Sequence, residues 1–400
     1  MTKHTLDPDS PWLLAILASL VALGPLSIDM YLPALPTMQV ALNTTVSQMH
    51  LTLSAYLIGF AVFHLACGPL ADRYGRKPVL ICGTTLFVLA SIGCSQADTI
   101  KELLLFRVLQ GVGACVGPTL ARAIVRDIFG PTRAARALSI LAMLMAVAPA
   151  LAPTLGGTML LFLPWSSIFI FLSLYGLASI FLVQRYVRES LPQKQSLHPI
   201  EIAKNYAQLI RDPFYLLVTL SSALMYAGLL TYLSSSSFVY IKMLGVPVQY
   251  FGYIFLTGVV GYALGSGLSA RLAGRRTPEQ LSLLGTTMGL AACLIMWLSS
   301  FLYPDKVATY MLPMALFSAA LGLTLPNSMA IALRPFPHIA GTASSLLGFI
   351  QMSIAAIASA LAGLLLTTSP QPMVLTMVGT AILSLILNFI MYKRHQNSAG

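Results

Sequence analysis

The sequence predicts an all-α membrane protein with twelve transmembrane helices in two pseudo-symmetric bundles of six. Three observations predict this fold class: long apolar stretches, few charges and a weak internal repeat. Of the 400 residues, 57% are hydrophobic and only 9% are charged, whereas a soluble domain has roughly 25% charged residues. A stretch of about 20 apolar residues can cross the hydrocarbon core as a helix, because a helix satisfies its own backbone hydrogen bonds. A water-soluble protein is therefore excluded.

The apolar stretches are separated by short polar segments. They predict spans at residues 11–34, 47–69, 78–97, 101–126, 136–160, 165–187, 213–240, 249–270, 279–302, 307–332, 339–366 and 371–392. The first span carries Asp29 and Pro33 and has no small-residue cleavage site after a short apolar core. We therefore expect it to be a retained helix and not a signal peptide.

The longest polar interval divides the chain into two sets of six spans. We expect an N-terminal bundle at 1–187, a cytoplasmic linker with an amphipathic helix at 188–212, and a C-terminal bundle at 213–400. The two halves also share a weak sequence repeat. The segment 68–77 after the second span resembles the segment 267–276, which lies 199 residues later. Such a repeat is typical of transporters in which two halves rock about a central site.

The basic residues are distributed unevenly between the loops. Eighteen of the 23 lysines and arginines lie in the termini and alternate loops, three lie on the other side, and Arg107 and Arg122 lie inside spans. By the positive-inside rule both termini are cytoplasmic. The net charge of +11 is thus explained by topology and by lipid attraction, and nucleic acid is not expected as a partner. The five cysteines have no metal-like spacing, so we expect no metal site.

Four segments resemble motifs of the major facilitator superfamily. Residues 68–77 match its loop motif, and residues 107–113 are similar to its proton-coupling motif. Residues 148–157 resemble the antiporter motif of the drug/proton branch, although alanines stand at two of its usual glycine positions. Residues 27–33 resemble the start of the Bcr/CflA-like drug-resistance transporters. The resemblance implies the major facilitator fold and proton-driven transport without a cofactor.

The loop motif implies a conformational latch at the cytoplasmic face. Its residues are Gly68, Asp72, Arg73, Gly75, Arg76 and, at the end of the fourth span, Asp127. Glycine at both ends of the motif suits a sharp bend between helices. In the second copy Arg271 replaces the aspartate, so the latch is expected to be one-sided. A charged turn without a mechanical role is the alternative.

The antiporter motif predicts a bent, thin helix. Pro149 and Pro153 remove backbone donors, and Gly156 and Gly157 allow close packing. We expect this helix to pack against a partner across the halves. Simple kinked packing without a directional role is the alternative.

Asp29 is the only acidic residue in the interior of a predicted span, because the other eleven lie in tails, in loops or at span ends, and Arg107 lies at a matching depth. At 1.5 Å per residue, both lie about 8 to 9 Å below the outer ends of their helices. A charge within hydrocarbon is expensive and usually functional. We therefore expect Asp29 to carry the proton and Arg107 to modulate it; helix packing is the alternative role for Asp29. Whether His64 titrates is left open.

Polar and aromatic residues on otherwise aliphatic spans are candidate cavity contacts. They are Tyr31, Ser54, Tyr56, Gln110, Tyr226, Tyr232, Tyr253, Asn327 and Gln351. Packing or a place in an interfacial belt is the alternative for each.

Together these features predict a monomeric antiporter of a bacterial inner membrane that exports small neutral or monocationic, partly apolar compounds such as drugs. A transporter dedicated to one metabolite, such as a nucleoside, sugar or siderophore, is the alternative. A membrane enzyme is disfavoured, because the sequence lacks a recognisable catalytic or metal-binding motif.

Overall fold

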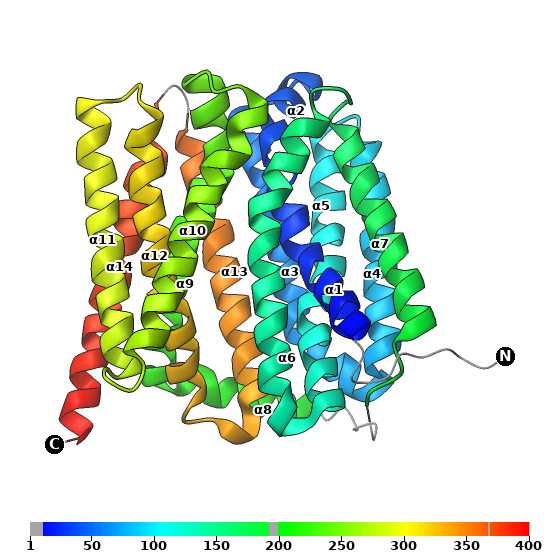
Figure 1. Cartoon of the computed structure of the whole chain (residues 1–400), viewed down its shortest axis with the longest axis vertical. Coiled ribbons are helices and arrows are strands. Elements are labelled where there is room, and N and C mark those ends of the chain that lie inside the picture. The colour runs from blue at the N-terminus through cyan, green and yellow to red at the C-terminus, as the bar shows by residue number, and fades with distance from the viewer. Residues whose placement is uncertain (1–10, 192–198, 367–368, 400) are drawn as a thin grey trace. The chain divides into compact units, whose positions relative to one another are not determined.

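The computed structural model describes residues 11–191, 199–366 and 369–399, with side chains at all of these except 11, 130–140, 142–147, 150, 199, 395 and 397–399. Apart from one isolated bridge between Ala273 and Arg276, the regular structure in these ranges is helical (Figure 1). Eleven helical segments within them are long and apolar enough to cross a membrane. The protein is thus an all-α, multi-pass membrane protein.

The described chain forms two compact units. Unit 1 comprises Met1–Asn43 and Ala55–His198, and unit 2 comprises Thr44–Ser54 and Pro199–Gly400. The helices of the N-terminal half are α1 (Pro11–Asp29), the short turn η1 (Leu32–Ala34), α2 (Leu35–Ala41), α3 (Val46–Tyr74), α4 (Arg76–Ser95), α5 (Ile100–Ala114), α6 (Val116–Met159) and α7 (Ser166–Tyr186). The first residues of α3 belong to unit 2 and the rest to unit 1.

The remaining helices lie in unit 2. They are α8 (Pro199–Arg211), α9 (Pro213–Ser237), the π-helical turn η2 (Phe238–Met243), η3 (Val248–Tyr250), α10 (Phe251–Leu272), α11 (Pro278–Leu302), α12 (Val307–Leu333), η4 (Pro337–Ile339), α13 (Ala340–Leu365) and α14 (Gln371–Ala399). Helix α8 lies within the predicted linker, and its Leu209 is buried while Ile200 and Ile210 are exposed.

The fourth and fifth spans differ from the prediction. The interval expected between residues 126 and 136 is helical, and α6 continues through it to Met159. The fourth span is therefore built from α5 and the start of α6, as Ile100–Phe129. The span predicted at 136–160 falls on the rest of α6, where many side chains lie outside the described residues. A polar interval can continue a helix when its backbone hydrogen bonds are kept, which hydropathy alone does not reveal.

The turn between α3 and α4 is shorter than expected. Gly68 lies inside α3, and nothing comes within 4 Å of a Cβ added there, so its predicted role in the bend is wrong. The chain reverses at Gly75 alone, whose φ of +108° is one that glycine adopts without strain. One glycine suffices because α3 runs to Tyr74 and α4 begins at Arg76.

Candidate functional site

Arg107 lies at the centre of a buried aromatic cage in unit 1. A capping box between Thr99 and Glu102 begins α5, and this helix carries Arg107 two turns into the bundle. The arginine is fully buried. Its guanidinium carbon lies 4.1 Å from the ring centroid of Tyr31 and 4.6 Å from that of Tyr56. Aromatic faces attract a cation most strongly where water is excluded, so the cage stabilises the guanidinium.

Neutral oxygen atoms also accept hydrogen bonds from this cation. One guanidinium nitrogen donates to the carbonyl oxygen of Ser27 at 3.1 Å and to the side-chain oxygen of Gln110 at 2.6 Å. Gln110 in turn donates to the hydroxyl of Ser91 at 2.9 Å. The predicted pairing of Arg107 and Gln110 on one helix face is therefore present. Helices α1, α4 and α5 are joined through one positive charge.

Asp29 ends α1 and is only 4% exposed. Its carboxyl group forms no hydrogen bond or ion pair with any described residue, Arg107 included. The shared depth of the two residues thus does not bring them into contact in this structure. Burial of an ionised carboxylate without a partner is expensive, so this position favours a group that can take up and release a proton.

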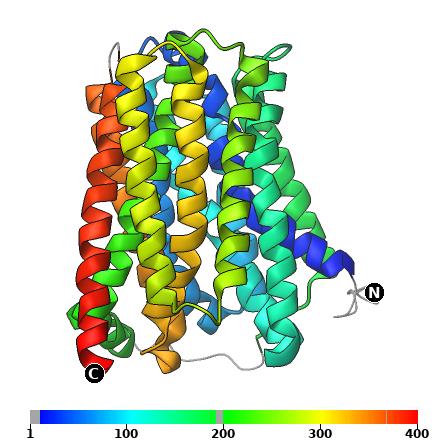
Figure 2. The same ribbon diagram turned by 60° about the vertical axis from the view of Figure 1, so that its left-hand side comes forward.

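The antiporter segment packs against the chain next to Asp29. Helices α1 and α6 lie side by side, as both views show (Figure 1, Figure 2). A Cβ added at Gly156 would collide with the carbonyl oxygen of Met30, and the neighbouring Pro153 and Gly157 are also buried. The close packing predicted for this helix is thus found with α1 in the same unit. A change at α6 is placed to act on the position of Asp29.

The predicted latch residues form a charge cluster around the turn at Gly75. The guanidinium of Arg76 lies 2.6 Å from Asp72 and 3.2 Å from Asp127, and its side chain is 13% exposed. Arg73 instead lies over the ring of Tyr74, 5.4 Å from its centroid.

Glu189 belongs to the same cluster and was missed by the sequence reasoning. Its carboxylate accepts hydrogen bonds from the backbone amides of Arg76 at 2.9 Å and Lys77 at 3.1 Å, at the start of α4. A carboxylate suits this place, because helix N-termini carry unsatisfied donors and partial positive charge. The two segments are over a hundred residues apart, so no local pattern could have indicated this contact.

The remaining cavity candidates lie in unit 2 and do not form one cluster. Ser54 donates to the carbonyl of Ala356 at 2.9 Å, and Gln351 donates to Ser222 at 3.3 Å. Tyr232 and Tyr240 share a hydrogen bond of 2.8 Å.

Three further candidates occupy separate places in that unit. Asn327 donates to Ser269 at 2.7 Å, Tyr226 is half-buried on α9, and Tyr253 is 60% exposed beside Tyr250. Most of these side chains therefore take part in packing contacts within their own unit. Within the described part of the chain, no group of three or more His, Cys, Asp or Glu side chains lies close enough together to hold a metal ion.

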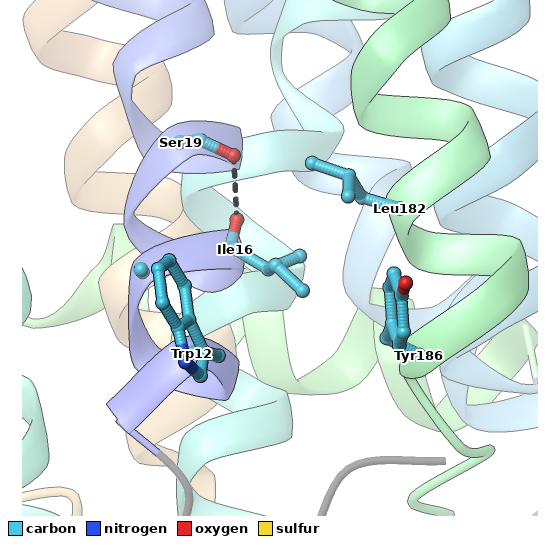
Figure 3. A pocket seen from close by; sticks show the side chains of 6 residues that line it. Trp12, Ile16, Ser19, Leu182 and Tyr186 are labelled. Atoms are coloured by element: carbon cyan, nitrogen blue, oxygen red, sulfur yellow. Dashed lines mark hydrogen bonds between the residues drawn. The ribbon is translucent and has the colours of Figure 1, made fainter. Parts of the chain in front are cut away.

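An apolar groove of about 490 Å³ lies between α1 and α7. Trp12, Ile16, Leu182 and Tyr186 line it, and the hydroxyl of Ser19 is turned back to the carbonyl of Ile16 (Figure 3). Neither Asp29 nor Arg107 borders this groove, so it is separate from the charged site.

A bundle of membrane-spanning helices with a buried cation and a buried carboxyl group is typical of a polytopic transporter. The family model of the Major Facilitator Superfamily matches residues 17–360, and the chain belongs to this superfamily. It is therefore a secondary transporter and not an enzyme.

Its relatives include drug-resistance proteins. The chain is 33% identical to the uncharacterized MFS-type transporter YdgK of Bacillus subtilis over 96% of both chains. It is 28% identical to the bicyclomycin resistance protein homolog of Haemophilus influenzae, covering 96% of this chain and 97% of the relative. It is 31% identical to the multidrug resistance protein MdtL of Vibrio parahaemolyticus over 94% of both. Within the superfamily the chain is thus similar to the Bcr/CflA-like drug-resistance transporters.

Solved structures agree with the fold. A bacterial homolog of the human lysosomal transporter Spinster matches with a TM-score of 0.76 at 16% identity, covering 97% of this chain and 98% of that one. The D-xylose-proton symporter matches with a TM-score of 0.73 at 14% identity, covering 96% and 97%. At these identities the likeness concerns the fold alone.

Proposed function

We propose that the protein is a proton-coupled antiporter that exports small, partly apolar compounds from a bacterial cell by alternating access. The observation that carries this proposal is the buried carboxyl group of Asp29, which has no partner among the described residues and lies beside the closely packed junction of α1 and α6. The drug-resistance relatives support export as the direction of transport. The basic loops support cytoplasmic termini and an inner-membrane location.

The proposed coupling step is an exchange at Asp29. In the arrangement seen here the carboxyl group is taken to be protonated, because an unpaired buried charge would be unfavourable. Substrate that enters the unit displaces this proton. The negative charge of the Asp29 carboxylate is then balanced by the substrate or by the guanidinium of Arg107 after that group has moved. Arg107 contributes by keeping α1, α4 and α5 in register around the site. The charge cluster at Arg76 acts as the latch of one end state.

The test is transport in everted membrane vesicles with an imposed proton gradient. Asp29→Asn keeps the size of the side chain but cannot exchange a proton, so gradient-driven accumulation should fall to the level of empty vesicles. The matched control is Asp98→Asn, because Asp98 is exposed in the loop before α5. Full gradient-driven transport by Asp29→Asn would contradict the proposal.

The charge of the site limits the substrates. Asp29 is the only acidic residue that the sequence places away from the ends of a span, so one proton per cycle and neutral or monocationic substrates are proposed. Moving each positive charge outward against the membrane potential costs about 2.3 kcal/mol per 100 mV. A substrate pair that differs only by a second quaternary ammonium group should show at least a tenfold lower export rate for the dication. Equal export of both compounds would overturn this limit.

A transporter for one metabolite is the competing function. Susceptibility of a deletion strain to a panel of chemically unrelated drugs, measured beside uptake and release of labelled nucleosides and sugars, separates the two. Altered susceptibility to several unrelated drugs supports multidrug export. A change confined to one metabolite supports the alternative.

A further inference from the structure

Among the residues whose side chains are described, each unit has an ion pair between its third and fourth spans. In unit 1, Arg76 at the first residue of α4 contacts Asp127 at 3.2 Å, near the end of the span Ile100–Phe129. In unit 2, Glu279 in the first turn of α11 contacts Arg334, which directly follows the last residue of α12, at 2.7 Å. Both pairs join the start of the third span of their half to the end of the fourth. The cation and the anion have exchanged helices.

The repeat motif at 267–276 does not reveal the ion pair of unit 2. The sequence comparison aligns Arg271 with Asp72 and predicts that unit 2 has no latch. The aligned loop residues Arg271, Arg275 and Arg276 are all exposed. The carboxylate lies one turn further along, at Glu279, and its side chain is 1% exposed.

The polarity in unit 2 is the one that helix dipoles favour. A negative charge is stabilised at a helix N-terminus and a positive charge at a C-terminus, and these are the places of Glu279 and Arg334. Thr277 and Gln280 cap the same end of α11 with reciprocal hydrogen bonds. In unit 1 the cation Arg76 lies at an N-terminus, where the dipole is unfavourable, and the carboxylate of Glu189 offsets it.

We propose that Glu279 and Arg334 are positioning residues that form a second latch, of reversed polarity, in unit 2. The pair fixes the start of α11 to the end of α12 and so keeps the basic loop at 271–276 in place while the unit moves. Its loss lowers the rate of conformational conversion without changing substrate contacts. This inference rests on the proposed alternating-access function for its kinetic part only.

The test combines five variants with two measurements. The variants are Arg334→Gln, Arg334→Lys, Glu279→Gln, the double variant Glu279→Gln/Arg334→Gln, and the control Arg276→Gln, which removes an exposed arginine from the neighbouring loop. The first measurement is the thermal unfolding midpoint of the purified protein. Arg334→Gln should be less stable than the double variant, because it removes the cation that faces a buried carboxylate. If the decreases in unfolding midpoint of the two single variants add up to that of the double variant, the two residues do not interact and the proposal is wrong.

The second measurement is the initial transport rate against substrate concentration in vesicles. Both single variants and the double variant should lose Vmax by about tenfold with KM unchanged within twofold, whereas Arg334→Lys and the control keep most of it. A double variant with the Vmax of the unsubstituted protein would show that the pair is merely structural. If the unsubstituted protein shows no proton-driven transport, the proposed function is wrong. The unfolding midpoints of the single and double variants still test the ion pair in that case.

Discussion

In unit 1 a fully buried cation connects helices, whereas in unit 2 four helices are joined by neutral side chains. Arg107 is fully buried against aromatic rings and neutral oxygens. In unit 2, Asn388 of α14 donates to Ser282 of α11 at 2.7 Å, and Ser282 shares a hydrogen bond of 3.2 Å with Ser328 of α12. Ser221 of α9 also exchanges hydrogen bonds with α14.

This contrast separates two uses of buried polarity. A buried charge alters the proton affinity of neighbouring groups, whereas amides and hydroxyls do not ionise near neutral pH and mainly fix helix packing. The difference supports the placement of proton coupling in unit 1. It also predicts that substitutions of similar size should affect transport strongly in one unit and weakly in the other.

Of the substitutions that test this contrast, the one at Arg107 is expected to have the largest effect. Arg107→Gln removes the charge and most of the contacts to Tyr31, Tyr56 and Ser27, so gradient-driven transport should fall by about 100-fold in vesicles. Arg107→Lys keeps the charge but not the planar, forked geometry, so it should recover only a small part of the rate. Transport by Arg107→Gln within twofold of the unsubstituted protein would remove the distinction between the units. Unfolding midpoints distinguish loss of function from loss of fold.

An intermediate effect is expected at Gly156. In Gly156→Val the added methyl groups would collide with the Met30 carbonyl, so α1 and α6 must separate at the level of Asp29. We expect a loss of about tenfold in transport rate together with a lowered unfolding midpoint, because such overpacking typically costs 1–3 kcal/mol. The control is Gly68→Ala, since a Cβ at Gly68 meets no atom within 4 Å. An equal effect of both changes would contradict the importance of this junction.

The sequence could predict features that depend on one segment at a time. Hydropathy located the helices, and the three-residue spacing of Arg107 and Gln110 placed both on one helix face, where they share a hydrogen bond. The bend at Gly75 followed from the loop motif. These properties are local, because lipid exposure, helix period and a positive φ act within a few residues.

Contacts between distant segments could not be predicted in this way. Glu189 and Phe169 approach Arg76 and Arg107 only because α7 and the segment after it pack against the other helices. The carbonyl of Ser27 carries no sequence signal at all, since every residue has one. Glu279 was treated as an ordinary charge at a span end, and its burial depends on Arg334 after the following helix. Gly68 shows the opposite kind of error. The motif predicted a bend at this glycine, but α3 continues through it.

The smallest effect is expected in the neutral network of unit 2. Asn388 is 1% exposed, and Asn388→Ala removes its hydrogen bond to Ser282. Interhelical hydrogen bonds in membranes contribute about 0.6 kcal/mol on average, so the unfolding midpoint should fall slightly and the transport rate should stay within twofold. A tenfold loss of transport would place a coupling role in unit 2 as well.

Asn388→Asp sharpens this last comparison, because it replaces an amide by a carboxyl group of nearly the same shape. If neutrality is what the network requires, this variant should be far less stable than Asn388→Ala at pH 8 and should recover stability as the pH is lowered and the carboxyl group is protonated. Transport measured at the same pH values should follow stability and should not acquire a new dependence on the proton gradient. A variant as stable at pH 8 as Asn388→Ala would show that this network tolerates an unpaired buried charge, and the placement of proton coupling in unit 1 would then need another explanation.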